Sequence, residues 1–145
     1  MICDQMTLDD FSQECSVIPI TPWNWRTVLT EHPPDFLLCE SAWQGPVKFE
    51  NCWRGQIYRN HKVRFENRRV LLSILDACRD NHIPTVFWNK EDPVFWGDQQ
   101  HDFVDTALRF DFIFTTAEEC ISRYQALGHS QVHLLQFGFS PQLFN

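Results

Sequence analysis

An apolar run gives way to charge within the stretch Ile83-Pro84-Thr85-Val86-Phe87-Trp88-Asn89-Lys90-Glu91-Asp92-Pro93. Short, continuous apolar runs are typical of parallel strands that are buried on both faces. In open α/β sheets, ligands bind just beyond the carboxyl ends of such strands. The stretch therefore predicts a buried parallel strand, and it places four polar residues where a ligand site is expected.

Short β-like runs alternate with helical patterns along the 145 residues, and no hairpin signal such as Asn-Gly separates them. This alternation is typical of a parallel sheet with helices packed on it. We expect strands at residues 1–4, 15–20, 35–41, 85–88, 111–115 and 131–137, and helices at residues 8–14, 24–29, 67–82, 103–110 and 118–127. The prediction is one Rossmann-like α/β domain over residues 1–145. Its doubly wound, mostly parallel sheet has about six strands, with helices on both faces.

Composition narrows the class of protein. Hydrophobic residues make up 43% of the chain and charged residues 21%, as in ordinary soluble globular proteins. No apolar run approaches the ~20 residues of a membrane span, and residues 1–4 lack the basic start of a signal peptide. The six cysteines lie far apart without a C-x-x-C pair. We therefore expect reduced thiols, no metal site, no transmembrane segment and a cytoplasmic location.

One segment carries charge opposite to that of the rest of the chain. Residues 48–69 hold seven Lys or Arg against two Glu, a net charge of +5, so the remainder of the chain is −12 and the whole is −7. Because duplex-binding domains are usually basic overall, nucleic-acid binding is not expected. Arg68 and Arg69 begin a predicted helix, where positive charge opposes the helix dipole. An anionic ligand there would satisfy the helix amides and both arginines, and a solvated basic loop is the alternative.

Several familiar fingerprints are missing from the sequence. Neither G-x-G-x-x-G nor G-x-x-x-x-G-K-[ST] occurs among the five glycines, which argues against a dinucleotide or P-loop site. The G-x-S-x-G elbow of α/β-hydrolases is also absent. Any catalytic or ligand-binding residues are therefore expected among polar side chains outside these motifs.

Four predicted strand ends carry such residues, and in a parallel sheet they converge on one rim. A carboxylate at this rim could act as a general base, and a lysine or arginine could hold a phosphate or carboxylate. The predicted catalytic residues are Asp4, Glu40, Glu91 and Asp92, and the sequence does not distinguish which of these four is the base. The predicted substrate-binding residues are Ser41, Trp43, Asn89, Lys90, Thr115 and Thr116, together with Arg68 and Arg69 of the basic segment.

Two of these positions also have a purely structural interpretation. Asp92-Pro93 fits an N-cap followed by a proline in the first helical position. Thr116-Ala117-Glu118-Glu119 fits a capping box. Asn89, Lys90 and Glu91 have no such explanation, because polar groups at the end of a buried strand need partners.

Five stretches resemble, in order, the N-terminal domain of CgeB-like (spore-maturation-protein-like) glycosyltransferases of the GT-B fold. They are residues 14–25, 34–43, 83–93, 110–116 and 135–138. The most specific motifs are Glu40-Ser41-Ala42-Trp43 and Trp88-Asn89-Lys90-Glu91-Asp92-Pro93. The resemblance covers nearly the whole chain.

The resemblance implies two Rossmann-like domains that face each other across a cleft, with no catalytic metal and no cofactor. The N-terminal domain receives the acceptor, and a C-terminal domain binds the nucleotide-sugar co-substrate. Residues 139–145 are expected to begin the linker into that second domain. This chain would then hold only the acceptor side.

The expected function is that of the acceptor-side domain of a glycosyltransferase, inactive without its donor-binding domain. A rim carboxylate would deprotonate a glycan or other hydroxyl acceptor, and Lys90 with the basic segment would hold an anionic acceptor or the donor diphosphate. One alternative is a non-catalytic binding or protein-interaction module that uses the same rim. Another is a flavodoxin-like nucleotide binder, which the missing glycine-rich loop disfavours.

Overall fold

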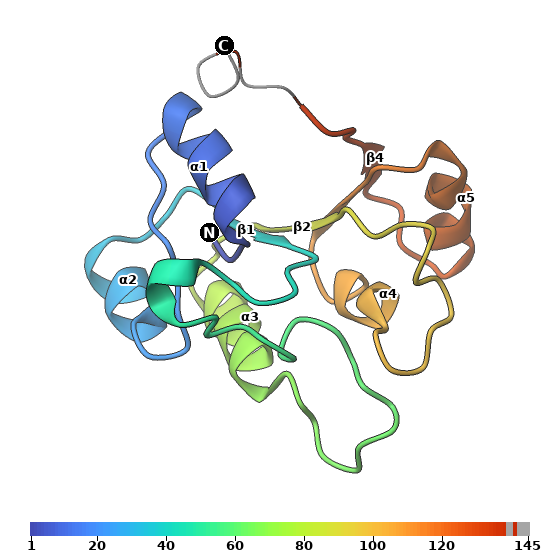
Figure 1. The fold of residues 1–145 in the computed structure, drawn as a ribbon, viewed down its shortest axis with the longest axis horizontal. Helices are drawn as coiled ribbons and strands as arrows, with labels where there is room; N and C mark the ends of the chain where they lie inside the picture. Colours follow the sequence, from blue (N-terminus) through green and yellow to red (C-terminus); the bar gives the residue numbers. More distant parts are fainter. Residues whose placement is uncertain (139–140, 142–145) are drawn as a thin grey trace.

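The computed structural model describes residues 1–138 and residue 141, and the expected linker at 139–145 falls almost entirely outside them. A four-stranded, all-parallel sheet forms its centre, with the strands in the order β1-β2-β3-β4 (Figure 1). The strands are β1 (Leu37–Glu40), β2 (Thr85–Asn89), β3 (Phe112–Thr115) and β4 (Val132–Leu134). Glu40 pairs with Trp88, and Asn89 pairs with Thr115, so the polar ends of β1, β2 and β3 lie side by side.

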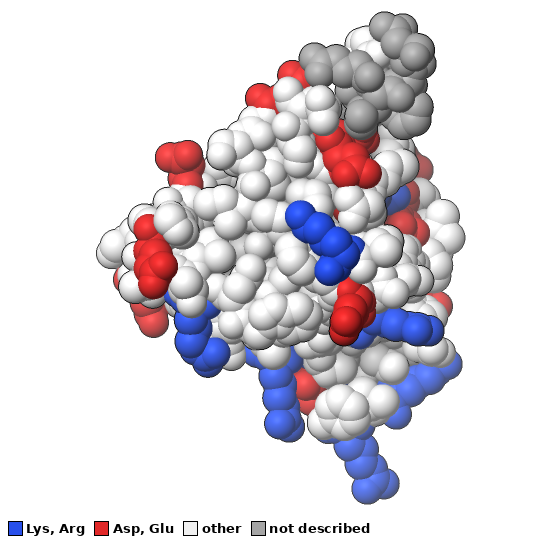
Figure 2. All heavy atoms as spheres, turned by 60° about the vertical axis from the view of Figure 1, so that its left-hand side comes forward, with Lys and Arg blue, Asp and Glu red and all other residues white. Residues whose placement is uncertain are grey.

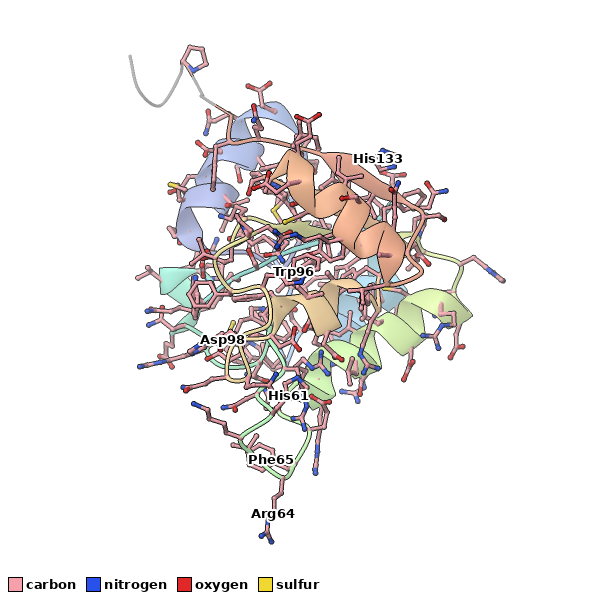
Figure 3. All side chains as sticks on the ribbon, turned by 90° about the vertical axis from the view of Figure 1, so that its right-hand side faces the viewer. His61, Arg64, Phe65, Trp96, Asp98 and His133 are labelled. Atoms are coloured by element: carbon pink, nitrogen blue, oxygen red, sulfur yellow. The ribbon has the colours of Figure 1, made fainter. Side chains whose placement is uncertain are left out.

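Helices cover both faces of the sheet. They are α1 (Gln5–Glu14), α2 (Trp25–Glu31), α3 (Arg69–Asp80), α4 (Phe103–Ala107) and α5 (Glu118–Ala126), with a 3₁₀ turn, η1, at Val47–Phe49. Figure 3 shows α1 and α5 on one side of the sheet and α3 and α4 on the other. The predicted α/β class, parallel sheet and two-sided helical cover are confirmed. No helix within the described part of the chain is long and apolar enough to cross a membrane.

The central elements form where the sequence pattern is strongest. Helix α3 buries Leu71, Ile74, Leu75 and Cys78, which recur at three- and four-residue spacing and make one apolar face. These residues join the strand residues of β1, β2 and β3 in one core cluster. Gly128 follows α5 with φ of +93°, a conformation that glycine adopts without a steric penalty, so it ends the helix as expected.

The expectation of about six strands is wrong at the N-terminus. Ile2 forms only an isolated parallel bridge with Cys39, in which the Ile2 amide donates to the Leu38 carbonyl oxygen at 2.8 Å. Residues 16–20 run beside Met1 and share two hydrogen bonds with it, from the Met1 amine to Ile18 O and from the Ile20 amide to Met1 O. They form no strand, since Pro19 lacks an amide that could donate to a ladder.

These two extended segments nevertheless reveal the winding of the chain. Residues 16–20 lie outside residues 1–3, which lie beside β1, and the chain then proceeds from β1 to β4 in the opposite direction. The direction of winding therefore reverses between Ile2 and β1. In doubly wound folds this switch point is where ligands bind, outside the carboxyl ends of the strands.

Candidate functional site

Hydrogen bonds link polar residues from all four strand ends at this switch point. Asp4 follows the extended segment at Ile2, Glu40 ends β1, and Lys90 follows β2. The amide of Lys90 donates to Ser41 Oγ at 2.9 Å, which ties the ends of β1 and β2 together. Thr116, after β3, donates to the carbonyl oxygen of Lys90 at 3.5 Å. The expected convergence is therefore present in the fold.

A buried ion pair occupies the centre of the rim. Glu40 is fully buried, and its Oε2 lies 2.7 Å from Nζ of Lys90, whose side chain is 10% exposed. Thr7 of α1 donates a short hydrogen bond to the same Glu40 oxygen and accepts one from Lys90 Nζ at 3.0 Å. Burial raises the pKa of Glu40, while the charge of Lys90 and the hydrogen bonds from Thr7 and the Asp4 amide act to lower it. Each of the two buried charges is therefore compensated by the other.

Asp4 holds the loop that follows β1. Its carboxylate accepts hydrogen bonds from three consecutive amides, those of Trp43 at 2.9 Å, Gln44 at 3.0 Å and Gly45 at 2.6 Å. Gly45 has φ of +91°, which favours glycine, and this conformation lets three successive amides point at one anion. Because Asp4 is occupied in this way, it acts as a loop anchor.

Trp43 connects this loop to Glu91. Its indole Nε1 donates to Glu91 Oε1 at 3.0 Å. The indole ring packs edge-to-face or tilted against four other rings with centroid distances of 5.1–5.6 Å, those of Tyr58, Phe95, His101 and Phe103. Such contacts restrict the ring beyond the effect of burial alone. Glu91 is half-buried, and its Oε2 accepts no hydrogen bond from any described residue.

A second network lies between the ends of β2 and β3. Asp92 accepts hydrogen bonds from Asn89 Nδ2 at 2.9 Å, Thr115 Oγ1 at 2.8 Å and Tyr124 OH at 2.9 Å. Asn89 Nδ2 also donates to Tyr124 OH at 2.9 Å. Burial raises the pKa of Asp92 to about 6, although the hydrogen bonds from Thr115 and Tyr124 lower it. Burial and the neighbouring Asp92 carboxylate raise the pKa of Tyr124.

Both structural interpretations of this region are wrong. No helix follows Asp92-Pro93, because residues 90–96 form consecutive turns and the Asp92 carboxylate points into the buried network. The N-cap of α5 is Ala117, which makes no side-chain cap. Thr116 donates instead to the carbonyl oxygens of Lys90 and Asp92, while Thr115 Oγ1 accepts from the Ala117 amide at 3.2 Å.

The two arginines at the start of α3 differ in their surroundings. Arg68 is 1% exposed, and its guanidinium contacts Glu66 (3.0 Å), Asp105 (2.7 Å) and Thr106 (2.8 Å). The hydrogen bond from Arg68 lowers the pKa of Glu66 to about 2. The structure thus gives Arg68 internal carboxylates in the place expected for an anionic ligand. Arg69 is exposed.

Two residues of these networks, Thr7 and Tyr124, are not among the site residues predicted from the sequence. Thr7 lies in the first turn of α1, and Tyr124 lies on the buried side of α5. Neither stands at a strand end, and a tyrosine on an apolar helix face is ordinarily a core residue. Among the described residues, no group of three or more His, Cys, Asp or Glu side chains is arranged to hold a metal ion. All six cysteines are free.

Comparison of the chain with protein-family models, with curated proteins and with solved structures finds no match. The function therefore rests on the geometry of the rim and on the resemblance carried by its motifs.

Proposed function

We propose that this domain is the acceptor side of a GT-B-like glycosyltransferase and that the acceptor hydroxyl binds at the switch-point rim. The observation that carries the proposal is the Trp43–Glu91 pair. A half-buried carboxylate is oriented by an indole nitrogen at 3.0 Å and keeps its Oε2 free of hydrogen bonds from the described residues. A general base needs this combination of fixed position and an available oxygen.

Glu91 is the catalytic base in this proposal because the other three carboxylates are engaged. Glu40 is neutralised by Lys90, Asp4 holds the 43–45 amides, and Asp92 accepts three internal hydrogen bonds. Lys90 forms contacts with Glu40 and Thr7, and the ammonium group has a third proton for an anionic group of a ligand. A donor nucleotide-sugar would be bound mainly by a second domain.

Calorimetric titration of this chain tests the proposal. We expect measurable binding of an oligosaccharide from a panel of neutral and anionic glycans, and weak or no binding of nucleotide-sugars. Glu91→Gln should weaken glycan binding roughly tenfold, since a charged hydrogen bond to a hydroxyl becomes a neutral one. The exposed Glu118→Gln is the matched control. Tight binding of a nucleotide-sugar by this chain alone would contradict the assignment of donor binding to another domain.

A non-catalytic binding or interaction module is the second candidate function. It is favoured by the internal contacts of Asp4, Glu40 and Asp92, since these three carboxylates are then not available to react with a substrate. The two functions differ in the effect of Glu91→Gln in an intact two-domain protein. In an enzyme, Glu91→Gln would reduce sugar transfer by far more than the roughly tenfold loss of acceptor binding, whereas a module would show no transfer even in the unmodified protein.

A further inference from the structure

A closed loop projects from the body of the molecule between Arg59 and Asn67. Asn67 Nδ2 donates to the carbonyl oxygens of Gly55 at 2.9 Å and Tyr58 at 2.7 Å. Arg59 Nη1 donates to the carbonyl oxygen of Phe65 at 2.9 Å and to Asn67 Oδ1 at 3.2 Å. These bonds close the base of the loop, so its tip is held in place before any partner arrives.

Contacts with residues 98–102 fix the direction of the loop. Arg59 and Asp102 form an antiparallel bridge, and the His61 amide donates to the carbonyl oxygen of Gln99 at 2.8 Å. His61 Nε2 also lies 2.8 Å from Asp102 Oδ2. The loop forms the lower end of the molecule in Figure 1, and Figure 3 places Arg64 and Phe65 at its tip.

The tip presents an aromatic ring next to cations. Phe65 is 57% exposed, and Lys62 and Arg64, which precede it in the loop, are also exposed. Lys62 Nζ donates to the neutral Gln100 Oε1 at 3.2 Å and keeps its charge. Among residues 1–138 and 141, no carboxylate oxygen lies within 4.0 Å of the side-chain nitrogens of Lys62, Arg64 or the nearby Arg69. Figure 2 shows lysine and arginine side chains gathered toward this lower end, and acidic side chains mostly above them.

The acidic residues at the base of the loop do not neutralise the tip, because they are engaged elsewhere. Glu66 is shared by Arg59 and Arg68, and Asp102 contacts His61. The arrangement therefore keeps positive charge and apolar surface at the tip. A loop that served only to connect β1 to α3 would require neither the exposed ring nor the hydrogen-bonded base.

We propose that the tip Lys62–Phe65 is a docking surface for an anionic lipid bilayer. The cations would lie among anionic headgroups, where each contributes to attraction, and the ring of Phe65 would enter the interface. A projecting tip fits a flat surface, whereas a peptide or single strand requires a groove. Contact through the tip also leaves the acidic side chains that Figure 2 shows above it farther from the surface, where salt screening weakens their repulsion.

Flotation of the protein with vesicles tests this proposal, which is independent of the proposed glycosyltransferase function. Binding is expected to vesicles containing phosphatidylserine, to be lost on vesicles of phosphatidylcholine alone, and to fall at high salt. Arg64→Glu should weaken vesicle binding roughly thirtyfold, because replacing a positive by a negative side chain changes the charge at the surface by two units. Phe65→Ser should weaken it roughly tenfold, because the apolar ring is lost. Two matched controls remove an exposed tryptophan and an exposed arginine elsewhere: Trp23→Ser, at a residue 65% exposed, and Arg79→Glu, whose side chain is 72% exposed.

Unchanged thermal unfolding of both loop variants would show that they fold. Absence of binding to the phosphatidylserine vesicles would overturn the proposal, as would equal binding to phosphatidylcholine. An equal loss of binding in the control variants would overturn it too. Tighter binding to an oligonucleotide than to the vesicles would assign the tip to nucleic acid instead.

Discussion

The Glu40–Lys90 pair is the residue-scale feature on which the rim depends. Both side chains are buried, and Thr7 satisfies each of them. Lys90→Met should reduce the free energy of unfolding by ~3–5 kcal/mol, because it leaves a buried carboxylate without its partner. Glu40→Gln in the same chain should restore part of that loss, which urea denaturation of the single and double variants would measure.

The exposed pair Asp76–Arg79 provides the control for this cycle. Its nitrogen and oxygen are 3.1 Å apart, yet both side chains are about two-thirds or more exposed, at 67% and 72%. Arg79→Met should therefore change stability by less than ~0.5 kcal/mol. A Lys90→Met variant as stable as Arg79→Met would show that the buried pair is not coupled as described.

Asp92 should make stability depend on pH in mildly acidic solution. Its pKa of about 6 in the folded protein exceeds the ordinary value of 3.8, so the folded state binds the proton more tightly. Stability contributed by this group therefore increases as pH falls from about 6 to about 4, by at most ~3 kcal/mol at 1.36 kcal/mol per pKa unit. Below the ordinary value, no further change is expected from this residue.

Comparison with Asp92→Asn isolates the effect of this residue from that of the other acids. The free energy of unfolding of the native chain minus that of the variant should rise as pH is lowered through this range. A difference that stays constant from pH 7 to about pH 4 would contradict the raised pKa.

The same residues show what a sequence can predict at this scale. The clustering of Glu40, Lys90 and Glu91 follows from parallel strands, whose polar ends must share one edge. The partners could not be predicted. Asp92-Pro93 and Thr116 fit capping patterns, but Asp92 accepts from Tyr124 OH in a buried network and Thr116 donates to the carbonyl oxygens of Lys90 and Asp92.

At the scale of elements, Arg68 joins α3 to α4. It lies at the N-cap of α3 and contacts Asp105 and Thr106 of α4. Arg68→Met should cost ~1–3 kcal/mol of stability, less than a fully buried pair, because Glu66 and Asp105 are partly exposed and can be hydrated. Arg69→Met, one residue on and exposed, should change stability by less than ~0.5 kcal/mol. Urea denaturation would compare them, and equal losses would contradict the bridging role.

Element prediction succeeded where a periodic pattern was long and failed where pairing was marginal. Helix α3 was expected at residues 67–82 and spans Arg69–Asp80, since its apolar face decides its position. The expected strands at 1–4 and 15–20 lie beside the sheet but form only an isolated bridge or separate hydrogen bonds. A pattern of apolar residues indicates burial there, but Pro19 and a short first segment limit the ladder.

At the scale of the whole molecule, two regions with different roles can be separated. The switch-point rim gathers the strand ends, and the loop at 60–66 projects at the lower end of the molecule (Figures 1 and 3). Among the described residues, the loop carries cations without carboxylate partners, whereas the cation of the rim, Lys90, is paired with Glu40. We therefore expect the rim to bind a glycan and the loop to contact a bilayer.

Trp43 and Glu91 are central to the proposed ligand site at the switch point, and nuclear magnetic resonance tests their role most directly. The six tryptophans each give an indole N–H signal, and Trp43→Phe identifies the one that contacts Glu91. On titration with the glycan panel, we predict that the Trp43 indole signal and the amides of Lys90 and Glu91 shift together with one saturation curve. Saturable glycan binding that shifts signals elsewhere and leaves these three unchanged would contradict the proposed site.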